Sequence, residues 1–141
     1  MKYLLDTNVI SELIVRTPNQ KVIDWIDSLA PETVYLSVIT IGELRKGIEK
    51  LAPSQRKDAL TLWLETDLLL RFAGKVVNIT VDVMLLWGEL TGRLEREGKP
   101  IAAIDSLIAA IALEGNYILV TRNESDFQFT GVSITNPWKT S

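Results

Sequence analysis

The sequence predicts an α/β fold, a three-layer α/β/α sandwich on a mostly parallel central sheet of about five strands. Short strand-like runs alternate along the chain with helical segments, which is the pattern of a parallel sheet. These runs are too apolar to face water, so helices must cover both faces of the sheet. The 141 residues suit one domain with a sizeable core, and we find no repeat or linker. We therefore expect residues 1–141 to form a single domain.

The first half of the chain supplies two strands and three helices. An apolar run leads into Asp6 and predicts the first strand, and apolar residues at helical spacing resume after a turn at Thr7 and Asn8. We expect helices over residues 9–15, 19–30 and 40–50, and the second strand over residues 33–38.

The second half continues the alternation. A long helical stretch begins after Pro53 and Ser54, and Gly115 with Asn116 suits the left-handed conformation that ends a helix. We expect strands over residues 75–79, 117–121 and 132–135, and helices over residues 80–97 and 101–114. Residues 136–141 are polar apart from Trp138, and we expect a loosely held tail.

The sequence also indicates where the protein works. No apolar run approaches the roughly 18 residues that span a bilayer, and Asp6 arrives before a secretory signal could form. We therefore expect a cytoplasmic protein that does not associate with membranes.

The chain has no cysteine and no histidine. Their absence excludes disulfides, thiol nucleophiles, thiolate zinc sites and Ser-His-Asp catalysis. An enzyme of this composition depends largely on oxygen-bearing side chains, which favour hard cations such as Mg²⁺ or Mn²⁺. The net charge of -3 argues against a general binder of polyanions, but it is compatible with a nuclease, because carboxylates that hold metal are themselves negative.

Asp105 is the strongest single indication of function. It lies in a helix that is apolar nearly all round, so we expect it to be buried. An unpaired buried carboxylate is costly, so Asp105 needs a partner. We favour a metal ion, because nearby residues offer no obvious cation. The structural alternative is a buried ion pair with an arginine.

Three further polar positions follow predicted strands. Asp6 follows the first strand, Glu43 lies in the first turn of the helix after the second, and the polar loop 121–127 follows the fourth. Ligands of α/β sheets bind beyond the carboxyl ends of the strands. We therefore expect these side chains to share one crevice with Asp105.

Each of these positions also has a structural explanation. Asp6 could cap the next helix, Thr40 and Glu43 fit a capping box, and the loop could be a simple turn. Within the loop the sequence leaves the fourth ligand open between Asp126, with Asn123 as helper, and Glu124.

Four fragments of the chain together resemble the PIN-domain ribonucleases, in particular the VapC and FitB-like toxins of type II toxin–antitoxin pairs. The fragments are LDTNVIS at residues 5–11, ITIGEL at 39–44, IDSLIAA at 104–110 and LVTRNESDF at 119–127, with NPW at 136–138 closing the pattern. Each fragment is short, but their order and spacing extend over almost the whole chain.

The resemblance implies a PIN-like endoribonuclease whose acidic pocket holds Mg²⁺ or Mn²⁺ to hydrolyse RNA, with transfer RNA among the candidate substrates. It also implies a homodimer inhibited by a small antitoxin protein. Asp6, Glu43 and Asp105 match the family's acidic triad, and Asp126 matches its more variable fourth acidic position. The matching pocket neighbours are Thr7, Thr121 and Asn123.

Three other functions fit the sequence less well. A phosphatase of the haloacid dehalogenase type needs a second Asp where this chain has Asn8. A receiver domain needs an acidic pair near the first strand and a lysine after the last, and neither is evident. The third is a non-catalytic PIN-like module that binds RNA or a protein partner. The intact set of Asp6, Glu43 and Asp105 argues against it, because such a module has no need for a costly carboxylate.

Overall fold

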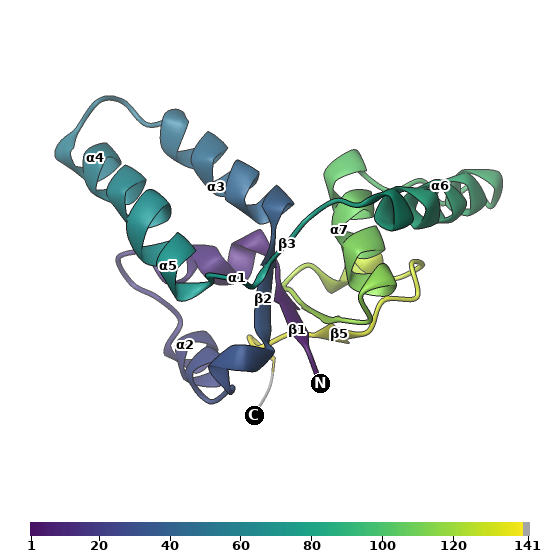
Figure 1. The fold of residues 1–141 in the computed structure, drawn as a ribbon, viewed down its shortest axis with the longest axis horizontal. Coiled ribbons are helices and arrows are strands. Elements are labelled where there is room, and N and C mark those ends of the chain that lie inside the picture. Colours follow the sequence, from purple (N-terminus) through teal and green to yellow (C-terminus); the bar gives the residue numbers. More distant parts are fainter. Residues whose placement is uncertain (140–141) are drawn as a thin grey trace.

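The computed structural model describes residues 1–139 of the protein. Its centre is a five-stranded sheet in the order β3-β2-β1-β4-β5 (Figure 1). The strands are β1 (Tyr3–Leu5), β2 (Val34–Ser37), β3 (Val76–Val77), β4 (Ile118–Val120) and β5 (Ile134–Thr135). Every neighbouring pair is parallel, which confirms the predicted α/β class.

The central strand β1 sets the position of the residues that follow the sheet. Tyr3 lies opposite Val34 of β2 and Ile118 of β4, and Leu5 lies opposite Val120. Because the three strands are parallel and aligned, their carboxyl ends meet at one edge.

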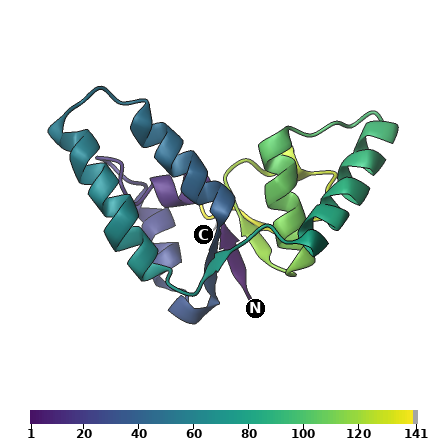
Figure 2. The same cartoon turned by 45° about the horizontal axis from the view of Figure 1, so that its top comes forward.

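Helices cover both faces of the sheet and form two wings, which Figure 2 shows on either side of the strands. One wing contains α1 (Thr7–Ser11), α2 (Gln20–Asp27), α3 (Val38–Glu49), α4 (Gln55–Leu62) and α5 (Leu69–Arg71), and the other contains α6 (Val81–Arg96) and α7 (Ala103–Glu114). Short 3-10 turns lie at Pro31–Thr33 and Glu124–Phe127. Within residues 1–139, no helix combines the length and the apolar character that crossing a membrane requires.

Each wing has its own hydrophobic cluster. Side chains alternate between the faces of a strand, so Leu5 joins the cluster of α1 to α5 while Leu4 joins that of α6 and α7. Both leucines are only 1% exposed, as expected of a strand that helices cover on both faces.

The elements follow the predicted order, but some boundaries differ. Helix α3 begins at Val38, earlier than predicted, because Ser37 caps it: the Thr40 backbone N–H donates to Ser37 Oγ at 3.2 Å. The stretch after Ser54 is not one α-helix, since a π-helical segment, Trp63–Leu68, separates α4 from α5.

The C-terminal segment is held more firmly than we expected. The Asn136 side-chain amide donates to Glu124 Oε2 at 2.9 Å, and its oxygen accepts from the Trp138 backbone N–H at 3.0 Å. Lys139 pairs with the same Glu124 carboxylate at 2.8 Å. These contacts differ from the loose tail that we expected over residues 136–141, of which residues 140 and 141 lie outside the described part of the chain.

Candidate acidic site at the carboxyl ends of the strands

Polar side chains gather where the central strand β1 and its neighbour β4 end. Asp6 follows β1 and Thr121 follows β4, and the Thr121 hydroxyl donates to Asp6 Oδ2 at 2.8 Å. Glu43 reaches this edge from α3, and Asp105 from the first turn of α7. Segments far apart in the sequence thus bring the three predicted acidic residues to one place.

Asp6 is buried, with 6% of its surface exposed, and three donors hold it. Besides Thr121, the Thr7 backbone N–H donates to Oδ1 at 2.8 Å and the Asn8 amide donates to Oδ2 at 3.3 Å. Burial raises the pKa of Asp6, and the Glu43 carboxylate adds to the rise, while the three hydrogen bonds oppose it. Asp6 is also the N-cap of α1, so both of its predicted roles are compatible.

Thr7 joins Asp6 to Glu43. Its hydroxyl donates to Glu43 Oε1 at 2.5 Å, while its backbone N–H donates to Asp6. The predicted capping box is wrong, because Ser37 rather than Thr40 is the N-cap of α3. Glu43 consequently lies in the second turn, not the first, and points toward α1.

Asp105 is half buried rather than fully buried. It lies in the first turn of α7, at the rim of the site, and the preceding Ile104 is 44% exposed. Within residues 1–139, Asp105 forms no ion pair with lysine or arginine, so the alternative of a buried ion pair is wrong. Burial and then repulsion from Asp126, Asp6 and Glu43 raise the pKa of Asp105 to about 6.

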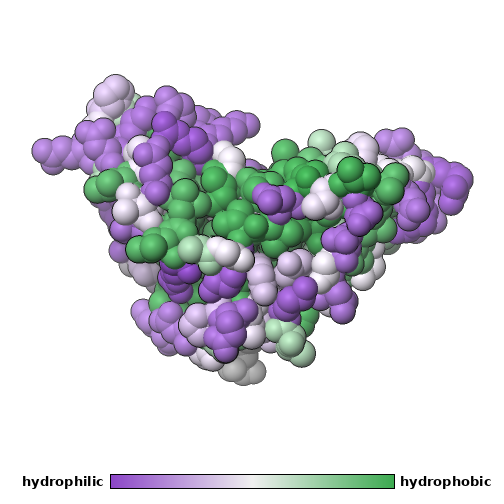
Figure 3. Space-filling model, in the orientation of Figure 1, coloured by the Kyte–Doolittle hydropathy of each residue, from purple (hydrophilic) through white to green (hydrophobic). Residues whose placement is uncertain are grey.

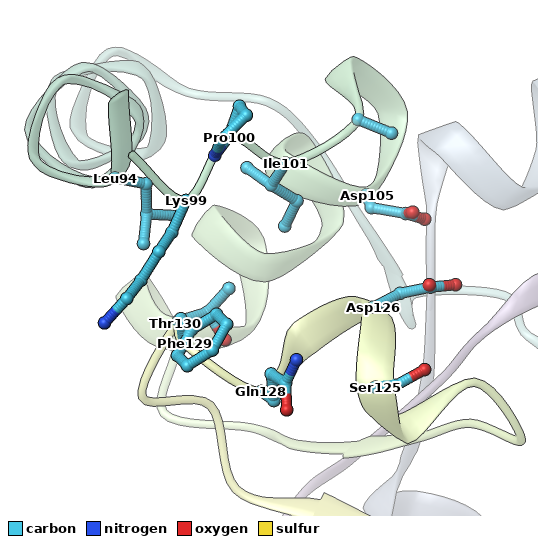
Figure 4. Close-up of a pocket in the computed structure, with 11 residues that line it drawn as sticks. Leu94, Lys99, Pro100, Ile101, Asp105, Ser125, Asp126, Gln128, Phe129 and Thr130 are labelled. Atoms are coloured by element: carbon cyan, nitrogen blue, oxygen red, sulfur yellow. The ribbon is translucent and has the colours of Figure 1, made fainter. Parts of the chain in front are cut away.

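The loop after β4 places Asp126 and Glu124 differently. Asp126 lies in an exposed 3-10 turn, and Figure 4 shows its carboxylate and that of Asp105 pointing in the same direction. Glu124 instead binds Asn136 and Lys139, and the hydrogen bond from Lys139, followed by that from Asn136, lowers its pKa. The Asn123 backbone N–H donates to the Thr121 hydroxyl at 3.1 Å. Of the two acidic loop residues, Asp126 is therefore the one near the site.

Asn8, which the sequence predicts as part of a turn, is a further polar neighbour of Asp6. Its amide donates to Asp6 Oδ2 and, at 3.2 Å, to the Thr121 hydroxyl, while its oxygen accepts from the Arg122 backbone N–H at 3.2 Å. Asn8 thereby ties the end of β1 to the end of β4. In the sequence, the indication of this contact is that Asn8 lies two residues after Asp6.

A groove of about 480 Å³ leads away from Glu43 between α3 and α7. Its walls carry the apolar side chains of Ile39 and Ile104 together with Lys46 and Lys50. Figure 3 shows apolar surface over the notch between the two wings. Positive charge and apolar surface thus adjoin the acidic residues.

The chemistry of these donors fits a hard divalent cation. All four acidic side chains offer oxygen, which Mg²⁺ and Mn²⁺ prefer, and a bound cation would relieve the repulsion that adds to burial in raising the pKa of Asp105. Within residues 1–139, no three carboxylates are grouped closely enough to form a ready-made metal cage. A cation at this edge would therefore draw the side chains toward one another.

Comparisons with known proteins agree with this fold over nearly the whole chain. The family model described as "PIN domain" matches residues 3–131. The plasmid stability protein StbB of Pseudomonas syringae pv. tomato is 42% identical over 96% of this chain and 98% of its own length. Toxin FitB of Neisseria gonorrhoeae is 40% identical, with 96% and 97% covered. The VapC ribonuclease Y4jK of Sinorhizobium fredii is 38% identical, also with 96% and 97% covered.

A solved structure also has the fold of this chain. The crystal structure of FitAcB from Neisseria gonorrhoeae contains a chain that superposes with a TM-score of 0.93 at 39% identity. The match covers 98% of this chain and 99% of that one.

Proposed function

This chain belongs to the PIN domain family, and we propose that it is an endoribonuclease that uses Mg²⁺ or Mn²⁺ to hydrolyse RNA phosphodiester bonds. One observation carries the proposal: Asp6, Glu43, Asp105 and Asp126 lie at one edge of the sheet, where burial and then repulsion from the other three carboxylates raise the pKa of Asp105. The Sinorhizobium relative is named a VapC ribonuclease, which supports RNA as the substrate of this chain.

Asp6 and Asp105 are the residues we assign to hold the cation directly, with Glu43 and Asp126 completing the site. When bound, the cation supplies positive charge that neutralises the carboxylates and the scissile phosphate and makes water a stronger acid. Thr121, Thr7 and Asn8 fix the orientation of Asp6 by hydrogen bonds. They keep one carboxylate in place throughout the reaction.

We assign Glu43 to hold the attacking water and to accept its proton. The Thr7 hydroxyl occupies Oε1, which leaves Oε2 available to a water at the crevice. Attack on phosphorus then breaks the bond to the leaving oxygen of the RNA chain, in line with the incoming water. Asp126, at the exposed side of the site, acts through an intervening water.

We also propose that the protein is the toxin of a type II toxin–antitoxin pair, that it forms a homodimer, and that a small antitoxin blocks it. The name of the Neisseria relative, Toxin FitB, supports the toxin role. Exposed apolar side chains support protein partners, because isolated monomers rarely leave such patches open. The exposed apolar side chains on and just before α6 are Ile79, Val81, Met84 and Leu85.

The proposal is tested by incubating the purified chain with transfer RNA and other structured RNA in Mg²⁺, Mn²⁺ or chelator. We expect cleavage with either metal, none with chelator, and none by Asp105→Asn. Glu124→Gln is the matched control, since Glu124 binds Lys139 instead of joining the site, and it should cleave as the parent does. RNA binding without metal-dependent cleavage would favour the non-catalytic module instead.

A further inference from the structure

A pocket of about 230 Å³ opens beside the acidic site, on the side of α6 and α7. Asp105 and Asp126 line one part of it, and Lys99 and Phe129 line another (Figure 4). The volume is below the roughly 300–1,000 Å³ of pockets that enclose a whole ligand. The pocket is therefore too small to enclose a whole ligand, and it suits part of a larger ligand that also reaches the acidic site and the exposed surface around Phe129.

Phe129 presents an aromatic ring to solvent from a fixed backbone. It is 47% exposed, whereas Phe127 is 1% exposed in the core. The Arg93 guanidinium donates to the Phe129 carbonyl at 3.3 Å, and the Thr130 hydroxyl donates to the Phe127 carbonyl at 2.7 Å. A ligand that stacks on this ring would therefore order little of the backbone, which lowers the cost of binding.

Lys99 brings a positive charge to the same pocket. Its ammonium lies 4.5 Å from the centroid of the Phe129 ring. The turn after α6 fixes its backbone, since the Lys99 N–H donates to the Leu94 carbonyl at 2.8 Å and Gly98 adopts a φ of 71°. Within residues 1–139, Lys99 forms no ion pair with a carboxylate, so its charge is available to an anion.

We propose that this pocket binds the nucleotide next to the scissile phosphate, with its base stacked on Phe129 and its phosphate beside Lys99. An aromatic ring next to a cation is how proteins hold single-stranded nucleic acid with little regard to the base. The inference rests on the proposed ribonuclease function, because Asp105 and Asp126 connect the pocket to the acidic site.

Binding of a single-stranded RNA oligonucleotide tests the proposal. Fluorescence anisotropy is measured on the full chain in chelator, which separates binding from cleavage, at several salt concentrations. Phe129→Ala should weaken binding about 5- to 150-fold, and Phe129→Trp should preserve it. Lys99→Ala should reduce the slope of log affinity against log salt by about 0.7, a change that Phe129→Ala should not produce.

Lys2→Ala is the matched control. The Lys2 ammonium lies 4.3 Å from the centroid of the Tyr117 ring, so it makes the same kind of contact. This contact lies where β1 and β4 begin, at the end of the sheet away from the acidic site. Its replacement should change neither the affinity nor the salt dependence.

The outcomes separate this proposal from the proposed function. If the parent binds RNA with these dependences but does not cut it in Mg²⁺ or Mn²⁺, the ribonuclease proposal fails while the nucleotide pocket stands. If Phe129→Ala and Lys99→Ala bind RNA as the parent does, the pocket is overturned even when the parent cuts RNA. If Phe129→Ala and Lys99→Ala keep the parent's affinity for RNA but no longer bind a protein partner, the nucleotide proposal is likewise overturned and the pocket is assigned to a peptide. A parent that does not bind RNA at all would overturn both.

Discussion

Replacing Asp105 with Asn should make the metal-free protein more stable. Burial and repulsion from Asp126, Asp6 and Glu43 raise the pKa of Asp105 from 3.8 to about 6. The folded protein therefore holds a proton at Asp105 more tightly than the unfolded chain does. The free energy of unfolding consequently falls as the pH rises from about 4 to about 6, and at pH 7 the ionised side chain is destabilising.

The size of this effect follows from the pKa. At about 1.36 kcal/mol per pH unit, the difference between 3.8 and about 6 corresponds to about 3 kcal/mol. Asp105 is only half buried, and solvent screens its charge, so we reduce the expected gain to about 1–1.5 kcal/mol. In a chain of this size that gain raises Tm by roughly 3–6 °C.

Thermal melts in chelator, followed by circular dichroism at pH 7 and pH 4.5, measure this gain. Asp105→Asn should melt above the parent at pH 7, and the difference should shrink at pH 4.5, where the parent carboxyl is protonated. Glu124→Gln should bring no gain, because its charge is paired with Lys139. An Asp105→Asn variant that melts at or below the parent at pH 7 would refute the reasoning.

Three further predictions concern the support of the site. Thr121→Val removes the donor to buried Asp6 and should lower the free energy of unfolding by about 1–3 kcal/mol in urea denaturation; an unchanged midpoint would show that Thr121 does not hold the carboxylate. Ser37→Ala removes the N-cap of α3 and should lower the free energy of unfolding by about 1 kcal/mol in the same assay. A larger loss in Thr40→Ala than in Ser37→Ala would instead support the capping box. Because protonation of Asp105 competes with metal, calorimetric Mn²⁺ affinity should fall about tenfold per pH unit below its pKa of about 6, and equal affinity at pH 7 and pH 5 would contradict this.

The sequence predicts the position of Asp6 because that position depends on local signals and one general rule. An apolar run before a carboxylate marks a buried strand, and parallel strands end at a common edge, which also places Thr121. The same reasoning places Glu43 and Asp105 near this edge, since each lies in a helix directly beside it.

Contacts between distant segments lie beyond such reasoning. Thr7 and Glu43 are 36 residues apart, and only the packing of α1 against α3 brings the hydroxyl to the carboxylate. Glu124 is excluded from the site by Asn136 and Lys139, a contact that the polar composition of the tail does not reveal.

Competition between equivalent local signals explains the other differences. Ser37 and Thr40 are both good N-caps, and Ser37 takes the role because the strand ends there and the helix begins at Val38. The apolar character of the helix around Asp105 suggests full burial. Its first turn instead lies at the rim, where Ile104 lines the groove toward α3.

Mn²⁺ binding to single variants tests most directly whether four carboxylates form one cation site. In calorimetric titrations of the parent, Asp6→Asn and Asp105→Asn should each weaken Mn²⁺ affinity by more than about tenfold. Glu43→Gln and Asp126→Asn should weaken it less, and Glu124→Gln should leave it unchanged. Parent-like affinity in both Asp6→Asn and Asp105→Asn, or a loss in Glu124→Gln as large as theirs, would contradict the site.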